Sequence, residues 1–236
     1  MPAGWISHCL RFFRKADRDT FSKGPGVHGR PTMNFYSQRI FPRIMDMVLS
    51  TSEFSVLRRS LLGDVSGDVF EVGFGTGLNL PHYPPHVRRI TAADPNPGAH
   101  RIAERRIAQS PIEVVHVPVS SEHLDLPDES FNSVVCTFTL CSIGDVDSAV
   151  AEMRRILRIG GRMFFIEHGL SDDPRIQWWQ HKLNPVNKII GDGCHLNRVP
   201  TTTILNSGLR MERLDTFYLK KAPKYGGFIY RGVAVK

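Results

Sequence analysis

The feature that most constrains this chain is a glycine-rich segment that follows a short apolar run. Residues 69–79 read Val-Phe-Glu-Val-Gly-Phe-Gly-Thr-Gly-Leu-Asn. Glycine has no side chain and adopts positive φ readily, so it lets the backbone turn tightly and approach a ligand closely. In an open parallel sheet, ligands bind at the carboxyl ends of the strands. The segment therefore predicts a strand followed by a ligand-binding turn that opens a helix.

The chain beyond this segment alternates between strands and helices. Apolar runs predict five strands, at 68–72, 89–94, 112–117, 131–137 and 162–167. Between the last two, apolar residues recur at spacings of three and four from Val146 to Leu157, which predicts an amphipathic helix. The pair Gly160-Gly161 is expected to end that helix as its C-cap. Such alternation is typical of a mostly parallel sheet with helices on both faces.

Two further strands are expected near the end of the chain, at 211–218 and 229–235. The connecting residues 220–227 are too few for the crossover that parallel neighbours need, so the final pair should be antiparallel. We therefore expect an α/β, doubly wound, Rossmann-like fold. Its sheet should be mostly parallel and seven-stranded, with an antiparallel last strand.

The sequence before the sheet divides into two parts. Residues 1–33 are expected to form an N-terminal segment and linker, in which an amphipathic stretch at 5–13 packs on the domain or touches a membrane surface. Residues 34–66 have apolar positions at helical spacing and should form helices that cover the site. Residues 67–236 should form the main domain, with an insertion at 170–200 on the substrate side.

Composition and charge narrow the range of partners. The formal net charge is +7, but the basic residues are scattered, so we expect a solvated basic surface and no nucleic-acid partner. The cysteines Cys9, Cys136, Cys141 and Cys194 form no CxxC pair, so no metal site is expected. Reduced thiols fit a cytoplasmic protein. The oligomeric state is left open.

The glycine spacing separates two classes of cofactor. A dinucleotide fingerprint has the spacing GxGxxG, whereas this chain has GxGxG with Leu78 at the place of the final fingerprint glycine. With Glu71 two residues before the first glycine, the segment resembles motif I of S-adenosylmethionine-dependent methyltransferases. The resemblance implies that Glu71 helps to hold the methionine amino group, directly or through water. It also implies cofactor contacts from the turn residues Gly73, Phe74, Gly75, Thr76, Gly77 and Asn79.

The second cofactor signal is an aspartate at the end of the second expected strand. Asp94 follows Gly77 by 17 positions, where an acidic side chain can accept hydrogen bonds from both ribose hydroxyls. The same side chain could instead cap a helix that starts near Pro95, and both roles can coexist. Pro95 is expected beside the cofactor as well.

Residues 119–132 resemble a stretch of the ubiquinone and menaquinone methyltransferases, with Asn132 where those relatives have aspartate. This resemblance implies adenine contacts from Ser121 and Glu122. Thr137, near the end of the fourth expected strand, should line the methionine end of the cofactor.

From about residue 34 to residue 236 the chain is most similar to the methyltransferase-like seven group of the methyltransferase type 11 family. The resemblance rests on segments such as Asn34-Phe35-Tyr36, Leu140-Cys141-Ser142 and Asp192-Gly193-Cys194-His195-Leu196. It implies S-adenosylmethionine as cofactor, S-adenosylhomocysteine as product and a small-molecule thiol as acceptor, and it adds Tyr36 as a cofactor contact. The animal members begin with a hydrophobic membrane anchor, so membrane location is not carried over, and peripheral contact stays open.

A thiol acceptor must lose its proton, because the thiolate is the nucleophile. The candidate bases are His168, after the fifth expected strand, and His195, in a glycine-rich loop, and a structural role for either is equally open. Asp192 could orient a histidine or only shape that loop. Trp178 and Trp179 should form an apolar pocket wall or part of the core.

Other functions remain open on the sequence alone. Within methyl transfer, the acceptor could be a quinone, a hydroxyl or a phospholipid amine. A nicotinamide-dependent oxidoreductase is disfavoured by Leu78. The alternative that is not an enzyme is a module that binds S-adenosylmethionine without catalysing a reaction.

Overall fold

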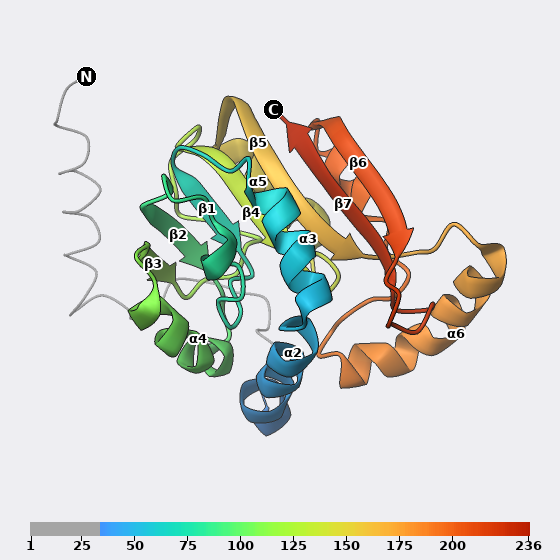
Figure 1. Ribbon diagram of the computed structural model, residues 1–236. Coiled ribbons are helices and arrows are strands. Elements are labelled where there is room, and N and C mark those ends of the chain that lie inside the picture. The colour runs from blue at the N-terminus through green and yellow to red at the C-terminus, as the bar shows by residue number, and fades with distance from the viewer. Residues whose placement is uncertain (1–33) are drawn as a thin grey trace, which may run out of the picture. The chain divides into compact units, whose positions relative to one another are not determined.

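The computed structural model describes residues 34–236 (Figure 1), so the expectations for 1–33 lie outside the described residues. Its sheet has seven strands in the order β3-β2-β1-β4-β5-β7-β6. Only β7 runs against its neighbours, since it pairs antiparallel with both β5 and β6. The expected doubly wound sheet is therefore confirmed. The strands are β1 Val69–Val72, β2 Arg89–Ala93, β3 Glu113–Val117, β4 Phe131–Thr137, β5 Leu157–His168, β6 Arg210–Tyr218 and β7 Phe228–Val235.

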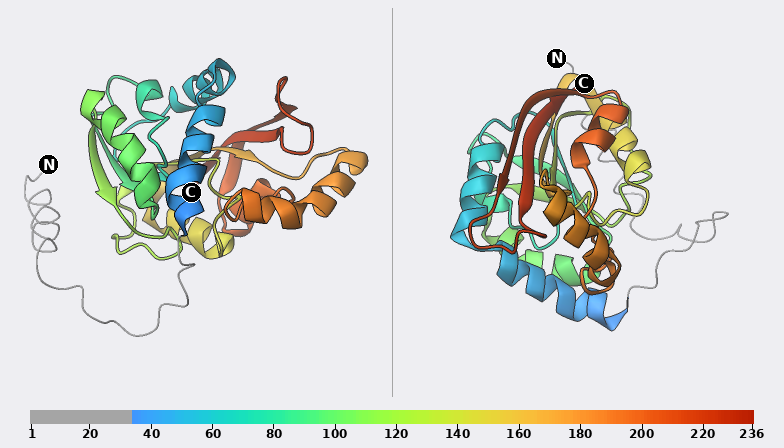
Figure 2. Two further views of the ribbon diagram at one scale, coloured as in Figure 1. Left: turned by 90° about the horizontal axis from the view of Figure 1, so that it is seen from below. Right: turned by 90° about the vertical axis from the view of Figure 1, so that its right-hand side faces the viewer.

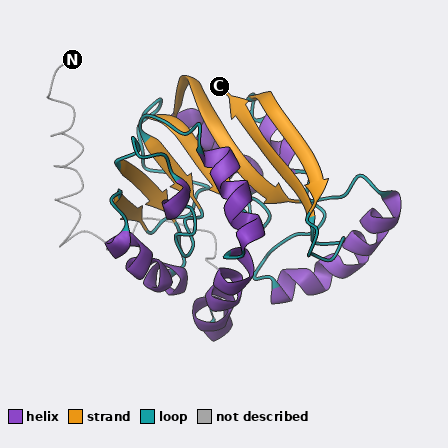
Figure 3. Ribbon diagram, in the orientation of Figure 1, coloured by secondary structure: helices purple, strands orange, loops and turns teal. Residues whose placement is uncertain are grey.

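Helices pack on both faces of this sheet (Figure 3), and the right-hand view of Figure 2 shows them on either side of it. Residues of β1 alternate between two buried clusters, with Val69 facing α3 and α4 and Phe70 facing α5 and α7. This is the period-two burial of a sheet covered on both sides. The helical segments are η1 Tyr36–Ile40, α2 Phe41–Leu49, α3 Ser52–Leu62, η2 Leu80–His82, α4 Pro97–Gln109, α5 Val146–Ile156, α6 Pro174–Ile190 and α7 Pro200–Asn206.

The strand limits match the expectation to within one residue, except that β5 begins five residues earlier than 162. The prediction that Gly160-Gly161 caps α5 is wrong. That helix ends at Ile156, and Leu157 already pairs with β4. Between Leu157 and Arg162, β5 makes a bulge, and Gly160 has a φ of 76° there. The glycines serve this bulge, whose backbone pairs with Lys236 at the end of the chain.

The prediction that the glycine turn opens a helix is also wrong. The chain makes only the single 3-10 turn η2 after Asn79. Proline stands at positions 81, 84 and 85. Proline donates no backbone hydrogen bond and disfavours the helical conformation in the residue before it, so a regular helix cannot extend through this stretch.

The N-terminal helices are tied to α4 and to the glycine turn. Asn96 caps α4 by accepting from Gly98 N at 2.8 Å, and its Nδ2 donates to the carbonyl of Ser37 in η1 at 2.9 Å. Arg106 forms a paired contact with Asp46 of α2, at 2.7 and 3.2 Å, and also donates to the Thr76 carbonyl at 2.9 Å. The position of α2 is thus coupled to the backbone of the turn.

Within the described residues, no helix is both long enough and apolar enough to cross a membrane.

Replacement of Gly98 by alanine should lower the free energy of unfolding by about 1–3 kcal/mol, the usual cost of overpacking. A Cβ at Gly98 would lie 1.8 Å from the backbone oxygen of Gln38, so η1 would have to move. The matched control is Gly63→Ala at the end of α3, where the nearest atom is 3.5 Å away. Urea denaturation of both variants measures the effect. A Gly98→Ala protein as stable as the control would contradict this close approach of η1 and α4.

Candidate cofactor and acceptor site

The glycine turn after β1 lies at the carboxyl ends of the parallel strands, the lower edge of the sheet in Figure 1. Gly73, Gly75 and Gly77 have φ values of 67°, 56° and 77°, a region that other residues rarely adopt. A Cβ at Gly73 would lie 2.0 Å from Thr139 Oγ1, so this position is closed by packing. A Cβ at Gly75 would meet nothing nearer than the Gly73 oxygen at 3.7 Å. The backbone at Gly75 is therefore open to a ligand.

Asp94 holds this turn in place from the end of β2. Its Oδ2 accepts from Gly75 N at 2.7 Å, and its Oδ1 accepts from Asn96 N at 2.7 Å. Burial raises the pKa of the carboxyl, and the hydrogen bonds from Asn96 and Gly75 oppose that rise. The alternative role of Asp94 as the helix cap is wrong, because Asn96 caps α4. Asp94 joins the two loops at which a ribose is expected.

Glu71 lies at the end of β1 and is 1% exposed. Its two oxygens accept from Tyr83 Oη at 2.6 Å and from Asn79 Nδ2 at 2.8 Å. Asn79 Nδ2 also donates to Thr137 Oγ1 at 3.0 Å, and Arg58 Nε donates to Asn79 Oδ1 at 3.1 Å. Burial raises the pKa of Glu71 to about 7. The structure thus brings together Glu71, Asn79 and Thr137, three of the residues that the sequence predicts to contact the cofactor.

Tyr83 and Arg58 were missed by the sequence analysis. Tyr83 stands among prolines and belongs to no motif, and Arg58 lies on α3, outside the sheet. Arg58 is buried although it is charged, and a buried arginine needs partners. Its position beside the apolar Leu57, Leu61 and Leu62 on α3 is the one signal that could have pointed to it.

The expected adenine side lies at β3 and the loop that follows it. Ser121 is buried, and Glu122 accepts from Asp145 N at 2.9 Å, which ties this loop to the start of α5. His100 and His116, which the sequence analysis missed, stack with their ring centres 4.0 Å apart. Their Nδ1 and Nε2 atoms, respectively, are buried without a hydrogen-bond partner in the described residues.

The acceptor side is expected at the ends of β4 and β5, where three ligating side chains meet. Cys141 follows β4, His168 ends β5, and Cys194 lies in the loop after α6. Their Sγ, imidazole nitrogen and Sγ atoms all lie within 4.8 Å of one another. His168 Nε2 is 3.0 Å from Cys194 Sγ. Cys141 and Cys194 are 53 positions apart, so the sequence carries no signal that they meet.

A buried carboxyl supports the end of β4. Glu167 Oε1 accepts from Thr139 N at 2.8 Å and from Leu140 N at 3.1 Å, and burial raises its pKa to about 8. Phe138, between Thr137 and these amides, has a φ of 55°. A bulky residue in this region is strained, and such strain concentrates at functional sites.

The remaining candidates lie in the loop 191–195 and in η1. Asp192 accepts from Ser37 Oγ at 2.6 Å, so in the described chain its hydrogen bond goes to η1 and not to a histidine. Tyr36 Oη donates to the carbonyl of Ile190 at 2.5 Å. The backbone of His195 donates to the Cys141 carbonyl at 2.9 Å. Burial lowers the pKa of His195, as do the charges of Arg198 and Lys188. The loop is thereby held between η1 and the end of β4.

Of the two expectations for Trp178 and Trp179, a place in the core is wrong, whereas both residues do line an apolar surface pocket, together with Pro174 and Arg175. Their side chains are 54% and 52% exposed on α6, where their rings meet edge to face. Gln180, not a tryptophan, is the buried residue of this helix, and it bonds Ser171 N and the Gly169 carbonyl.

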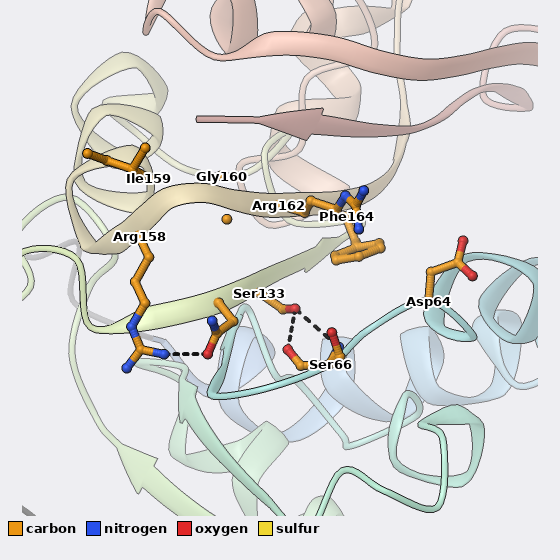
Figure 4. A pocket seen from close by; sticks show the side chains of 10 residues that line it. Asp64, Ser66, Ser133, Arg158, Ile159, Gly160, Arg162 and Phe164 are labelled. Atoms are coloured by element: carbon orange, nitrogen blue, oxygen red, sulfur yellow. Dashed lines mark hydrogen bonds between the residues drawn. The ribbon is translucent and has the colours of Figure 1, made fainter. Parts of the chain in front are cut away.

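A polar pocket of about 200 Å³ lies at the other end of the strands (Figure 4). Ser133 near the start of β4 and Arg158 in the β5 bulge line it. Ser133 pairs in register with Val69, the first residue of β1, so this pocket is on the edge opposite the glycine turn. It plays no part in the site described above.

Comparisons with known proteins agree with this geometry. The family model described as "Methyltransferase domain" matches residues 70–165. The human protein named thiol S-methyltransferase TMT1B is 33% identical over 192 residues, which cover 73% of this chain and 78% of that protein. The rat protein of that name is 33% identical over 171 residues, covering 70% of this chain and 64%, just under two thirds, of the relative. A solved S-adenosylmethionine-dependent methyltransferase from Mesorhizobium loti shares the fold, with a TM-score of 0.56 at 15% identity, covering 79% of this chain and 98% of that one.

Replacement of Asp94 by asparagine should weaken S-adenosylhomocysteine binding by about tenfold or more, since each hydrogen bond to a charged group is worth ~1.5–3 kcal/mol. The amide cannot accept from both Gly75 N and Asn96 N, so the turn loses one of its two fixed points. Glu113→Gln, an exposed acid on β3, is the control. Titration calorimetry measures both proteins, and NAD should bind to neither. An unchanged dissociation constant in Asp94→Asn would remove Asp94 from the site.

The ligand-free protein should lose stability through Glu71 as the pH rises. The folded-state pKa of about 7 lies above the ordinary value of 4.5, so the folded state holds this proton more tightly than the unfolded state. Its contribution is complete below pH 4.5 and is lost as the pH rises through 7. From pH 5 to pH 8, Glu71→Gln should gain on the order of 1–3 kcal/mol relative to wild type. Denaturant unfolding at both pH values tests this, with Glu113→Gln as control, and a pH-independent difference for Glu71→Gln would refute it.

Proposed function

This chain belongs to the class I S-adenosylmethionine-dependent methyltransferases of the methyltransferase type 11 family, and on that premise we propose that it methylates the sulfur of a small-molecule thiol. The observation that carries the choice of acceptor is the similarity to human TMT1B over most of that protein.

The residues of the glycine edge fit the cofactor. The backbone at Gly75 is open to close approach, and Asp94 offers a carboxylate where the ribose hydroxyls of an adenosine are bound in this fold. The buried acid Glu71, with Asn79 and Thr137, forms the polar group at the methionine end. When bound, S-adenosylmethionine supplies a methyl group activated by its sulfonium. We further propose that Tyr36, Ser121, Glu122, Pro95, Phe74, Thr76 and the other turn glycines complete this binding site.

The acceptor side is proposed to lie between the ends of β4 and β5 and the loop 191–195. The contacts of Tyr36 with Ile190 and of Ser37 with Asp192 draw η1 against that loop. Such a cover would hold the acceptor in line with the methyl group and exclude water, which is what a transfer between two bound molecules requires. The methyl group of a cofactor that spans β1 to β4 would face Cys141 and His168.

The acceptor thiol must be converted to its thiolate in this place. His168 and His195 both lie at this edge, as expected, and their service as a base stays a prediction. His168 Nε2 contacts Cys194 Sγ at 3.0 Å, and a ring nitrogen of His168 lies within 4.8 Å of the sulfur atoms of both Cys141 and Cys194. A cytoplasmic location also stays a prediction, supported by the free thiols of Cys136, Cys141 and Cys194.

The class of acceptor is tested by measuring methylation of a panel of small molecules. The purified protein with S-adenosylmethionine should form S-adenosylhomocysteine with alkyl and aryl thiols and far less with matched phenols, amines, phosphatidylethanolamine and a demethylated quinol. Asp94→Asn should lower turnover with every acceptor alike, and Glu113→Gln should not. Methylation of a phenol or an amine but of no thiol would refute the thiol proposal and leave the family assignment in place. Cofactor binding without turnover on any acceptor would favour the non-catalytic module.

A further inference from the structure

We propose that Cys141, His168 and Cys194 form a three-ligand Zn²⁺ site whose fourth position receives the acceptor thiol. The ion site stands on the geometry of these residues alone. The role of its fourth position rests on the proposed function. The cluster is the one group of three or more histidine, cysteine or acidic side chains in residues 34–236 whose ligand atoms converge in this way.

The donor set suits zinc. Thiolate sulfur and imidazole nitrogen are its usual protein ligands, and catalytic zinc sites keep three protein ligands and one open position. With bond lengths of ~2.3 Å to sulfur and ~2.0–2.1 Å to nitrogen, tetrahedral ligand atoms are about 3.5–3.8 Å apart. The three atoms here lie within 4.8 Å of one another. His168 Nε2 and Cys194 Sγ, at 3.0 Å, are closer than zinc-bound ligands, so these two atoms must move apart by about 0.5 Å when an ion binds.

The backbone around the cluster is held by contacts that do not depend on an ion. The His195 amide donates to the Cys141 carbonyl at 2.9 Å, and Asn187 Nδ2 donates to the Cys194 carbonyl at 2.8 Å. A Cβ at Gly191 would lie 3.0 Å from the Cys194 Cβ and 2.7 Å from the Asn187 oxygen. Glycine at 191 thus allows Cys194 to approach Asn187 at the end of α6 closely. The ligands are brought to one point by the fold itself.

Two polar atoms beside the cluster have no partner. His168 Nδ1 and Glu167 Oε2 are buried and make no hydrogen bond in the described residues. Buried polar atoms are nearly always paired, and an exception calls for a water or an ion that the protein normally holds. His168 Nδ1 is the ring nitrogen that does not face Cys194, and a metal-binding histidine donates its second ring N–H to a carboxylate, a carbonyl or a water, so this unpaired atom fits a histidine that binds an ion through Nε2.

The reaction at such a site balances without a further reactant. The acceptor thiol binds to Zn²⁺ as a thiolate, because a coordinated thiol is deprotonated, and its proton passes to solvent. The thiolate sulfur then attacks the methyl carbon of S-adenosylmethionine. A sulfur–carbon bond forms, the bond from the methyl group to the sulfonium breaks, and its electron pair stays on the sulfur of S-adenosylhomocysteine. The product thioether is neutral, so it is a weaker ligand and leaves.

The ion site is tested by metal content. The 236-residue chain, stripped with chelator and dialysed against Zn²⁺, should hold about one Zn²⁺ per chain by mass spectrometry. Cys194→Ser and His168→Ala should each lower Zn²⁺ affinity at least about tenfold. His181→Ala is the matched control, because His181 is exposed on α6. Circular dichroism of each variant checks that the fold is kept. Zn²⁺ bound equally by all variants, or by none of the proteins, would overturn the proposal.

The open position is tested with Co²⁺ in place of Zn²⁺. The protein should show cobalt–thiolate absorption, and an added thiol should change it without any S-adenosylmethionine present. No change with a thiol that the enzyme methylates would overturn the role of the fourth position and leave thiol methylation standing. A changed spectrum without methylation would instead count against the proposed function alone. A Cys141–Cys194 disulfide in protein purified without reductant and free of metal would overturn the ion site.

Discussion

The hydrogen bond from Gly75 N to the Asp94 carboxylate is the contact on which the rest of the site depends. It joins the turn after β1 to the end of β2, and it requires both the positive φ of Gly75 and the short side chain of an aspartate. Arg106 extends the same network, since it bonds the Thr76 carbonyl and, through Asp46, fixes α2. Asp94 and Arg106 together thus couple the glycine turn to the end of β2 and to α2.

The strand order divides the site into two halves. From β1 to β3 the strands follow one another toward one edge of the sheet, and from β4 onward they lie toward the other edge. The order therefore reverses between β1 and β4, and open α/β sheets bind ligands at such a switch point. On one side lie Asp94 and the loops expected to bind the nucleoside. On the other side lie the ends of β4 and β5, with Cys141 and His168. The segment 170–200 adds Cys194 to this second half, where we propose that the acceptor binds.

The sequence was sufficient for features that are local along the chain. The strands follow from apolar runs, and Glu71, the glycines and Asp94 follow from spacing within one βαβ unit. The absence of a helix after Asn79 is predictable, because the prolines that prevent it are visible in the sequence. Tyr83, Arg58 and the meeting of Cys141 with Cys194 were not predictable, since their proximity is set by strand order and by the path of α6. Spacing rules for metal ligands describe neighbours in sequence, so they could not find ligands on three separate elements.

The most direct measurement is a crystal structure with S-adenosylhomocysteine and a methyl thioether product bound together. Our account places the ribose hydroxyls on Asp94, the homocysteine end beside Glu71 and Thr137, and the thioether sulfur next to Cys141, His168 and Cys194. A product bound on the β2 side of β1, or a homocysteine sulfur directed away from the ends of β4 and β5, would contradict this account.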